Sequence, residues 1–357
     1  MSKLPNIINL VKKDVRELKP YQVENIPCRV KLDAMENPYH LPESLMMKIL
    51  EGVKRVEINR YPDSIASRLK GIISSDVNVP IDNIIIGNGS DELIQLILNT
   101  FGENGDRVLF PTPTFSMYGI ISKSLSLKTE VIPLDENWEL PLDKFLHKIE
   151  KNKPKVIFIS FPNNPTGNSF DRESIIKILQ KAPCIVVIDE AYYDFSRKTF
   201  LPYLKEYKNL IILRTLSKIG MAGLRVGYLM ADNEICRELN KVRLPYNSNA
   251  VSQEIASIIL ENRVEIQKQI EAIISERERL IDGLKGIKGI KPFPSETNFI
   301  LFKTVKDGKE VFSRLANSGI LVRNFGSDSY LKDCLRVTVG THEENNEFLD
   351  VIQKSVV

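Results

Sequence analysis

The sequence is poor in the residues that build metal centres and disulfide frameworks. It has only four cysteines and three histidines among 357 residues. These are Cys28, Cys184, Cys236, Cys334, His40, His147 and His342. The cysteines lie far apart without a C-x-x-C spacing, and no histidine has a partner at ligand spacing. We therefore expect no metal site and no disulfide framework, and a reducing cytoplasm is the expected location.

Charge and hydropathy argue against two further classes of partner. Lysine and arginine number 49 against 46 acidic residues, and no basic stripe with interleaved aromatics is present. Nucleic acid is therefore not an expected partner. No run approaches the roughly 18 apolar residues that a membrane span needs. The start, MSKLPNIINLVKKDVREL, also lacks the apolar core of a secretion signal, so we expect no membrane association.

What the sequence does have is an alternation of short apolar runs and amphipathic stretches. Runs rich in Ile and Val indicate buried strands at 83–87, 107–110, 129–134, 155–160, 184–190, 209–215 and 225–230. Helical spacing between them is found at 91–101, 116–125 and 171–182. This alternation predicts an α/β domain over residues 41–245, with a mostly parallel sheet covered by helices. In such sheets, binding sites form at the carboxyl ends of the strands.

The pattern changes on both sides of this domain. Residues 1–40 contain three prolines and no clear period, so they are expected to form an arm and a connector. Beyond 231 a long charged, helix-periodic stretch leads into mixed elements, with apolar runs at 298–303, 319–324 and 334–340. Residues 246–357 are therefore expected to form a smaller α+β domain.

The first predicted strand is followed by a loop suited to an anion. In GNGSDEL (87–93), two glycines permit a tight turn, and Ser90 can cap the next helix. A helix N-terminus presents free N–H groups to a phosphate. The loop is not a dinucleotide fingerprint, because Glu92 occupies the position of the third glycine. Taken alone, it is equally typical of a well-capped helix.

Two further strands end in polar residues. FPNNPTGNSF (161–170) is a rigid loop that presents Asn163 and Asn164 in fixed orientations, although a structural turn has the same composition. CIVVIDEAYYDF (184–195) places Asp189 and Glu190 after five hydrophobic residues. A buried carboxylate needs a cation or hydrogen bonds, so at least one of the two is expected to emerge at the carboxyl edge of the sheet.

The segment RTLSKIGMAGLRVGY (214–228) adds a candidate nucleophile. Lys218 lies 29 residues after Asp189, about one helix and one strand, so both side chains can emerge at the same edge. Thr215 and Ser217 supply hydroxyls, and Arg225 supplies a planar cation suited to phosphate. A lysine for a Schiff base, a carboxylate for a ring nitrogen and an anion site together fit one ligand, a phosphorylated pyridine aldehyde.

Motifs along nearly the whole chain resemble the fold type I pyridoxal-phosphate aminotransferases and, within them, the histidinol-phosphate branch. The motifs are LDAMENP (32–38), RYPD (60–63), GNGSDE (87–92), PTPTFSMY (111–118), FPNNPTG (161–167), DEAYYDF (189–195), TLSKIGMAGLRVGY (215–228), ETNFIL (296–301) and LRVTVG (335–340). One departure is the interval from Lys218 to Arg225, seven positions here and one fewer than in many members. We expect a tighter loop that keeps the arginine in place.

The resemblance implies a role for each matching residue. Lys218 would form the Schiff base and move the proton, and Asp189 would pair with the pyridine nitrogen. Asn164 and Tyr192 would hydrogen-bond the phenolic oxygen, and Tyr118 would stack on the ring. The implied phosphate site is Gly89, Ser90, Asp91, Thr215, Ser217 and Arg225, with Tyr61 reaching the phosphate of the neighbouring subunit of a homodimer. The implied substrate-binding residues are Tyr21, Asn37, Arg323 and Arg336.

The implied activity is a ping-pong transamination in histidine biosynthesis. L-histidinol phosphate and 2-oxoglutarate would give imidazole-acetol phosphate and glutamate, with pyridoxal 5′-phosphate as cofactor. Because one substrate carries a phosphate and the other two carboxylates, two arginines and a tyrosine suit both. An aromatic aminotransferase and a threonine-phosphate decarboxylase, a lyase, remain alternatives. A transcription regulator is disfavoured, since about forty residues leave no room for a DNA-binding module.

Overall fold

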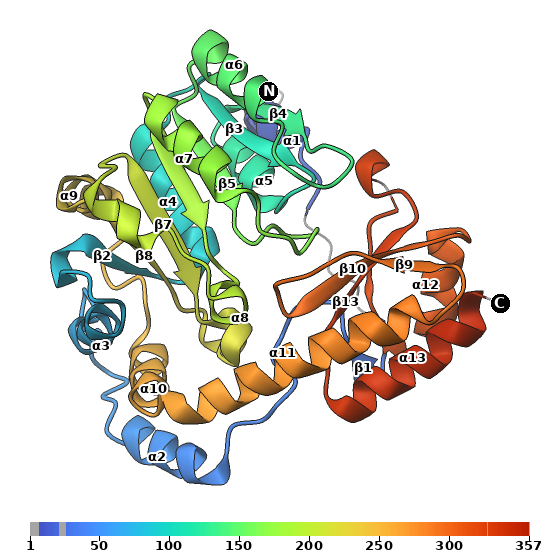
Figure 1. Cartoon of the computed structure of the whole chain (residues 1–357). Helices are drawn as coiled ribbons and strands as arrows, with labels where there is room; N and C mark the ends of the chain where they lie inside the picture. Colours follow the sequence, from blue (N-terminus) through green and yellow to red (C-terminus); the bar gives the residue numbers. More distant parts are fainter. Residues whose placement is uncertain (1–6, 21–25, 327, 357) are drawn as a thin grey trace, which may run out of the picture.

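The computed structural model describes residues 7–20, 26–326 and 328–356. Two units lie side by side, and the long helix α11 (Arg263–Lys285) runs from one to the other (Figure 1). Among the described helices, none combines the length and the apolar character that crossing a membrane requires.

The larger unit is built on a seven-stranded sheet. In spatial order its strands are β2 (Ile84–Gly87), β8 (Gly227–Ala231), β7 (Leu210–Thr215), β6 (Ile185–Asp189), β5 (Val156–Ser160), β3 (Arg107–Thr112) and β4 (Lys128–Pro133). Only β8 runs against its neighbours, β2 and β7, whereas the other pairings are parallel. The prediction of a mostly parallel sheet is therefore confirmed.

Helices cover both faces of this sheet. One face packs against α4 (Ser90–Phe101), α5 (Met117–Ser124) and α9 (Asn233–Val242). The core on the other face includes α2 (Glu43–Val53), α3 (Ser67–Val77), α6 (Leu142–Asn152), α7 (Arg172–Lys181), the short α8 (Tyr193–Ser196) and α10 (Ala250–Glu261). Because both faces are covered, the central strands are apolar almost without interruption.

The smaller unit is an antiparallel sheet with helices on it. The strand order is β12 (Arg323–Asn324), β13 (Cys334–Thr338), β10 (Phe299–Thr304) and β9 (Ile290–Pro292). Helices α12 (Gly308–Asn317) and α13 (His342–Val356) and the second half of α11 complete its core. This is an α+β arrangement, as the sequence predicts.

The division of the chain between the two cores differs in detail from the expected boundaries. Near the N-terminus, β1 (Val30–Lys31) pairs in parallel with β11 (Ile320–Leu321), so part of the expected connector belongs to the smaller core. Helix α10, which lies beyond residue 246, packs in the larger core. The cores change within α11, where Ile273 faces the larger one and Leu280 the smaller. The boundary that the sequence suggests at residue 246 therefore lies about 30 residues before the point where the packing changes from the larger core to the smaller one.

Short helices fill several connections. They are η1 (Ile7–Leu10), α1 (Lys13–Arg16), η2 (Ile81–Asn83), η3 (Leu201–Lys205), η4 (Ser217–Ile219), η5 (Ala222–Leu224) and η6 (Ser329–Leu331). Two of them, η4 and η5, form the connection from β7 to β8, at the carboxyl end of β7. This connection carries the predicted nucleophile.

Candidate active site

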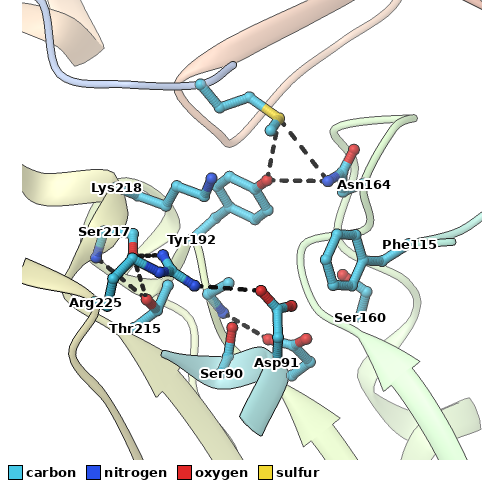
Figure 2. A pocket seen from close by; sticks show the side chains of 13 residues that line it. Ser90, Asp91, Phe115, Ser160, Asn164, Tyr192, Thr215, Ser217, Lys218 and Arg225 are labelled. Carbon is cyan, nitrogen blue, oxygen red and sulfur yellow. Dashed lines mark hydrogen bonds and ion pairs between the residues drawn. The ribbon is translucent and has the colours of Figure 1, made fainter. Parts of the chain in front are cut away.

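A cavity opens at the carboxyl ends of the central strands, where the sequence predicts a site. Its volume is about 90 Å³. Its lining consists of Met35, Ser90, Asp91, Phe115, Ser160, Asn164, Asp189, Ala191, Tyr192, Thr215, Ser217, Lys218 and Arg225 (Figure 2). The loops after β2, β3, β5, β6 and β7 all contribute. Ser160 pairs with Asp189 in the register of β5 and β6, so these two strand ends are adjacent.

One corner of the cavity is an anion site. The prediction that Ser90 caps helix α4 is wrong, because Ser90 is the first residue of the helix and Gly89 precedes it as the N-cap. No side chain of the described residues caps this end, which leaves N–H groups of the first turn available. Arg225 lies beside this helix end, with Nη1 3.3 Å from the Ser217 hydroxyl oxygen and Nη2 3.3 Å from Asp91 Oδ2. Thr215 donates to Ser217 over 2.9 Å. Helix dipole, guanidinium and hydroxyls therefore converge, as phosphate binding requires.

Two glycines allow this close approach. A Cβ on Gly89, which has a φ of +85°, would lie 2.5 Å from Arg225 Nη2. A Cβ on Gly227 would lie 2.7 Å from the backbone nitrogen of Ser90. The absence of a side chain at Gly89 thus leaves room for the Arg225 guanidinium, although Gly89 itself is not among the residues that line the cavity. The packing explains why small residues stand at the start of α4 and the start of β8.

The shortened loop after Lys218 keeps Arg225 at the cavity. Helices η4 and η5 are joined at Gly220, whose φ is +102°, and Arg225 itself has a φ of +53°. The backbone thus turns twice through the left-handed region within a few residues. Arg225, which ends this loop, lines the cavity despite the short interval from Lys218.

Asp189 is a buried carboxylate without a cation at salt-bridge distance in the described chain. Its Oδ2 accepts a hydrogen bond from the Tyr118 hydroxyl at 2.7 Å, and its Oδ1 accepts one from the Ala191 backbone N–H at 3.1 Å. Burial raises the pKa of Asp189 to about 6, against the hydrogen bonds, which lower it. The side chain is thus fixed and faces a space that a cationic group could fill.

Lys218 projects into the same cavity. Its Nζ lies 5.9 Å from the centre of the Tyr192 ring, and no hydrogen bond or ion pair holds it within the described residues. Desolvation, together with the positive charge of Arg336, lowers the pKa of Lys218 to about 8. Roughly a tenth of the amine is therefore neutral at pH 7, far more than for a solvated lysine, and the neutral form is the one that a nucleophile or a base requires.

Contacts beside the cavity join the two units, and they involve Arg336, which is not itself among the lining residues. Arg336, on β13, donates from Nη1 to Asn164 Oδ1 at 2.6 Å and from Nη2 to the Asp33 carbonyl at 3.0 Å. Asn164 in turn donates from Nδ2 to the Tyr192 hydroxyl at 3.1 Å. The Sδ atom of Met35 lies 3.4 Å from that hydroxyl. The smaller unit thereby places an arginine beside residues of the larger one.

The prediction for Tyr118 has to be corrected. Its ring is fully buried below the cavity lining and stacks on Phe158 with 4.7 Å between the ring centres. Phe115, three residues earlier in the same motif, lines the cavity instead (Figure 2). Since α5 begins only at Met117, Phe115 belongs to the loop before the helix and faces the cavity, whereas Tyr118 in the first turn points into the core.

Other predicted residues lie outside the lining. Asn37 donates to Gln269 at 2.8 Å and accepts from the Tyr39 backbone. Tyr61 is 81% exposed. Arg323 lies on β12 at the edge of the smaller sheet. Tyr21 falls outside the described residues.

Asn163, which the sequence presents together with Asn164, is fully buried. It holds the loop by bonds to Thr114, Pro113 and Thr166. Sequence reasoning also did not select Met35, Phe115, Ser160 or Ala191 as lining residues. Phe115 and Met35 stand inside quoted motifs, so proximity to those motifs was the available signal.

The donor set fits a phosphorylated pyridine aldehyde. The anion corner at α4, the amine of Lys218 and the carboxylate of Asp189 line one continuous cavity. The backbone positions at Gly89 and Gly227 leave the approach to the anion corner clear of side chains. Each of the three chemical groups of such a ligand therefore has a complementary partner.

Comparison with known proteins agrees with this site. The chain matches the family model "Aminotransferase class I and II" over residues 29–352. The chain therefore belongs to the class I and II aminotransferases. A histidinol-phosphate aminotransferase from Caldanaerobacter subterraneus subsp. tengcongensis is 43% identical, over 98% of this chain and 99% of the relative. Within the class, the chain belongs to the histidinol-phosphate aminotransferase family.

Solved structures support the assignment of the fold. The histidinol-phosphate aminotransferase from Clostridium acetobutylicum superimposes with a TM-score of 0.84 at 27% identity, over 91% of this chain and 98% of that chain. A histidinol-phosphate aminotransferase from Sinorhizobium meliloti in complex with pyridoxal-5′-phosphate has a TM-score of 0.88 at 21% identity, over 99% and 98%. At that identity the second likeness concerns the fold alone.

Proposed function

We propose that this chain transfers the amino group of L-histidinol phosphate to 2-oxoglutarate in histidine biosynthesis, with pyridoxal 5′-phosphate as cofactor. The products are imidazole-acetol phosphate and glutamate. The observation that carries the proposal is the shared cavity of Lys218, Asp189 and the anion corner. The substrate is inferred from relatives of the histidinol-phosphate aminotransferase family that align over nearly their full length.

Each part of the cofactor has residues that would hold it. Lys218 would hold the aldehyde carbon, Asp189 the ring nitrogen, and Asn164 with Tyr192 the phenolic oxygen. Phe115 takes the place of Tyr118 as the aromatic wall beside the ring. The phosphate would be held by Ser90, the backbone of Asp91, Thr215, Ser217 and Arg225. When bound, the cofactor supplies an electron-accepting ring that stabilises negative charge at the substrate Cα.

The residues of the chain supply the acid–base chemistry. With a pKa of about 8, the amine of Lys218 is neutral for roughly a tenth of the molecules at pH 7 and for about half of them at pH 8. The neutral amine would take the proton from the substrate Cα and would return one to the aldehyde carbon of the cofactor. Asp189 would keep a positive charge on the ring nitrogen through ion pairing. This pairing in turn favours the ionised form of Asp189 itself.

The two substrates share one anion-binding region. Arg336 is buried beside Asn164 at the junction of the two units, where the reacting amine would lie. Its planar guanidinium matches a carboxylate of glutamate and a phosphate of histidinol phosphate equally well. Arg323, which neighbours Arg336 in the register of β12 and β13, is the second candidate. Tyr21 and Asn37 complete the proposed substrate contacts.

The proposal includes a cytoplasmic homodimer in which Tyr61 reaches the cavity of the partner subunit. Tyr61 is 81% exposed and stacks on Tyr246, with 4.5 Å between the ring centres. Ile58 and Leu244 are exposed nearby in sequence, and an exposed apolar surface of this kind favours subunit contact. Sedimentation velocity tests the dimer. Tyr61→Ala should weaken cofactor binding in a dimer and leave it unchanged in a monomer.

The decisive experiment supplies one half-reaction at a time. The enzyme loaded with pyridoxal phosphate is mixed with a single amine and no oxo acid, and formation of pyridoxamine phosphate is followed by absorbance. Histidinol phosphate should convert the cofactor rapidly and phenylalanine much more slowly. Equal rates would make the protein an aromatic aminotransferase, and carbon dioxide release from threonine phosphate would make it a decarboxylase. Lys218→Ala, the control, should convert none in the same time.

A further inference from the structure

Tyr118, which does not line the cavity, has a contact with a residue that does. Tyr118 reaches Asp189 from α5, the helix that follows β3, and donates its hydroxyl to Oδ2 at 2.7 Å. Both side chains are buried, with 0% of Tyr118 and 3% of Asp189 exposed. Only Asp189 lines the cavity. Tyr118 therefore lies directly behind the carboxylate, as seen from the space where the cofactor ring would sit.

The tyrosine ring is held rigidly. It stacks on Phe158 at an interplanar angle of 9°, and Phe115 meets it edge-on, with 5.5 Å between the ring centres. Such a ring has no space in which to rotate, so the hydroxyl stays at a fixed place. On the other oxygen of Asp189, the Ala191 backbone N–H donates at 3.1 Å. One donor on each oxygen fixes the plane of the carboxylate.

The electrostatics give this contact a second consequence. Burial raises the pKa of Asp189, and the hydrogen bond from Tyr118 counteracts that rise because it stabilises the ionised form. Burial and the charge of Asp189 raise the pKa of Tyr118 well above its ordinary value. The phenol therefore keeps its proton and remains a donor over the whole working range of pH.

We propose that Tyr118 is a positioning residue, whose hydroxyl orients the Asp189 carboxylate and keeps it ionised to receive the positively charged ring nitrogen of the cofactor. The inference rests on the proposed cofactor and is independent of which amine the enzyme accepts. It also accounts for an aromatic motif that supplies two rings in different roles. Phe115 forms the cavity wall, and Tyr118 holds the acid behind it.

The test removes a single oxygen atom. Tyr118→Phe keeps the stacked ring and loses the donor to Asp189. The matched control is Tyr228→Phe, because Tyr228 is also buried, and its hydroxyl faces Arg214 instead of Asp189. Both variants and the wild type are prepared as full-length chains without cofactor. The Asp189 carboxyl is followed by carbon-13 NMR of labelled aspartate, with its signal identified by its loss in Asp189→Asn.

The wild-type carboxyl should titrate with a midpoint of about 6, and Tyr118→Phe should raise that midpoint while the control leaves it in place. Pyridoxal phosphate affinity is then measured across the same pH range. Tyr118→Phe should weaken binding about tenfold near pH 6, where its carboxyl is protonated, and about twofold or less near pH 8.5. A constant loss at all pH values, or an unchanged midpoint, would overturn the proposal.

Failure of the cofactor assignment gives a separate result. In that case the wild type would not bind pyridoxal phosphate, whereas the carboxyl titration would still be readable in every variant. Loss of the fold in Tyr118→Phe would show in its unfolding curve. In that case Ser160→Ala replaces Tyr118→Phe as the test variant, because Ser160 also approaches the Tyr118 hydroxyl. Removing the Ser160 hydroxyl should shift the titration midpoint of Asp189 by a smaller amount.

Discussion

Asp189 and Glu190 are consecutive residues at the end of β6, yet they have opposite surroundings. Asp189 faces the cavity, with hydrogen bonds from Tyr118 and Ala191 and no cation at salt-bridge distance in the described chain. Glu190 faces the other side of the sheet and forms an ion pair with Arg214 at 2.8 Å. Both carboxylates are buried. Alternation along a strand thus sends one acid to the site and the other into the core.

The difference between them separates function from structure. On the Glu190 side, the charge is compensated: Arg214 donates two hydrogen bonds to Oε2, and Thr199 and the Phe200 backbone supply further donors. On the Asp189 side, no cation lies at salt-bridge distance in the described chain. Burial raises the pKa of both acids, to about 6 for Asp189, so the difference between them is the cation and not the burial. A buried acid with satisfied partners maintains the fold, whereas one that lacks its cation is suited to receive it from a ligand.

The largest effect is expected from Asp189→Asn. The neutral amide cannot hold the positive charge on the ring nitrogen, so transamination should fall by about 10²–10³-fold. The same change should leave the cofactor-free protein as stable as the wild type, or more so, at neutral pH. The folded state raises the pKa of this acid, so ionised Asp189 costs stability above about pH 6, and the cost disappears as the pH falls.

The measurements are single-turnover rates and urea unfolding of the cofactor-free chain. Unfolding of the wild type at about pH 5 and pH 8 gives the pH dependence, which Asp189→Asn should flatten. An Asp189→Asn protein that is strongly destabilised at neutral pH would contradict the comparison, because it would assign a structural role to the acid on the cavity side.

Glu190→Gln should lower the stability of the protein and leave cofactor binding almost unchanged, the opposite of Asp189→Asn. It leaves the Arg214 guanidinium buried without its counter-charge, so the free energy of unfolding should fall by about 3 kcal/mol or more. Replacing both partners, as in Glu190→Gln with Arg214→Met, should recover part of that loss, since no buried charge remains. Urea unfolding measures the stability. Cofactor affinity at a temperature where the variant is folded should stay within about threefold of wild type.

Much of this site could be predicted from the sequence because its parts stand at strand ends. A run such as VVID must place its acid at the carboxyl edge, and parallel strands bring Asp189, Lys218 and Ser90 to one edge without further information. What composition alone could not predict is which side of the strand each polar residue faces. Asp189 and Glu190 are equally suited on composition, the family resemblance selects Asp189, and the pairing of Glu190 with Arg214 in the structure agrees with that choice.

The same limit explains the misassigned aromatic residue. Phe115 and Tyr118 lie in one motif, and their directions depend on where α5 begins, which the sequence leaves uncertain by a few residues. The pairing of β1 with the smaller unit could not be predicted either. Strand β1 is only two residues long, and its partner β11 lies near the other end of the chain. Pairing over that distance has no local signal, so residues 30–31 were expected to be a connector.

Lys218 offers a test of the cavity side by pH. In the cofactor-free protein, desolvation lowers the pKa of this amine to about 8, so its reaction with an amine-directed reagent should reach half its limiting rate near that pH. Arg336→Gln should raise the midpoint, because it removes a positive charge that disfavours the protonated amine. Mass spectrometry of the Lys218 peptide gives the rates. A midpoint near the ordinary lysine value of 10.5 would show that the amine is fully solvated.

The smallest effects come from a hydroxyl on each side of the sheet. Ser217→Ala removes a hydroxyl that accepts from Thr215 and Arg225, so pyridoxal phosphate affinity should fall about fivefold, with little change in stability. Thr199→Ala removes a hydroxyl that contacts Glu190 and Arg214, so the free energy of unfolding should fall by about 1 kcal/mol. Here affinity should be almost unchanged. If both variants altered both quantities, the two sides would be energetically coupled through the sheet, and the division between a structural and a functional acid would not hold.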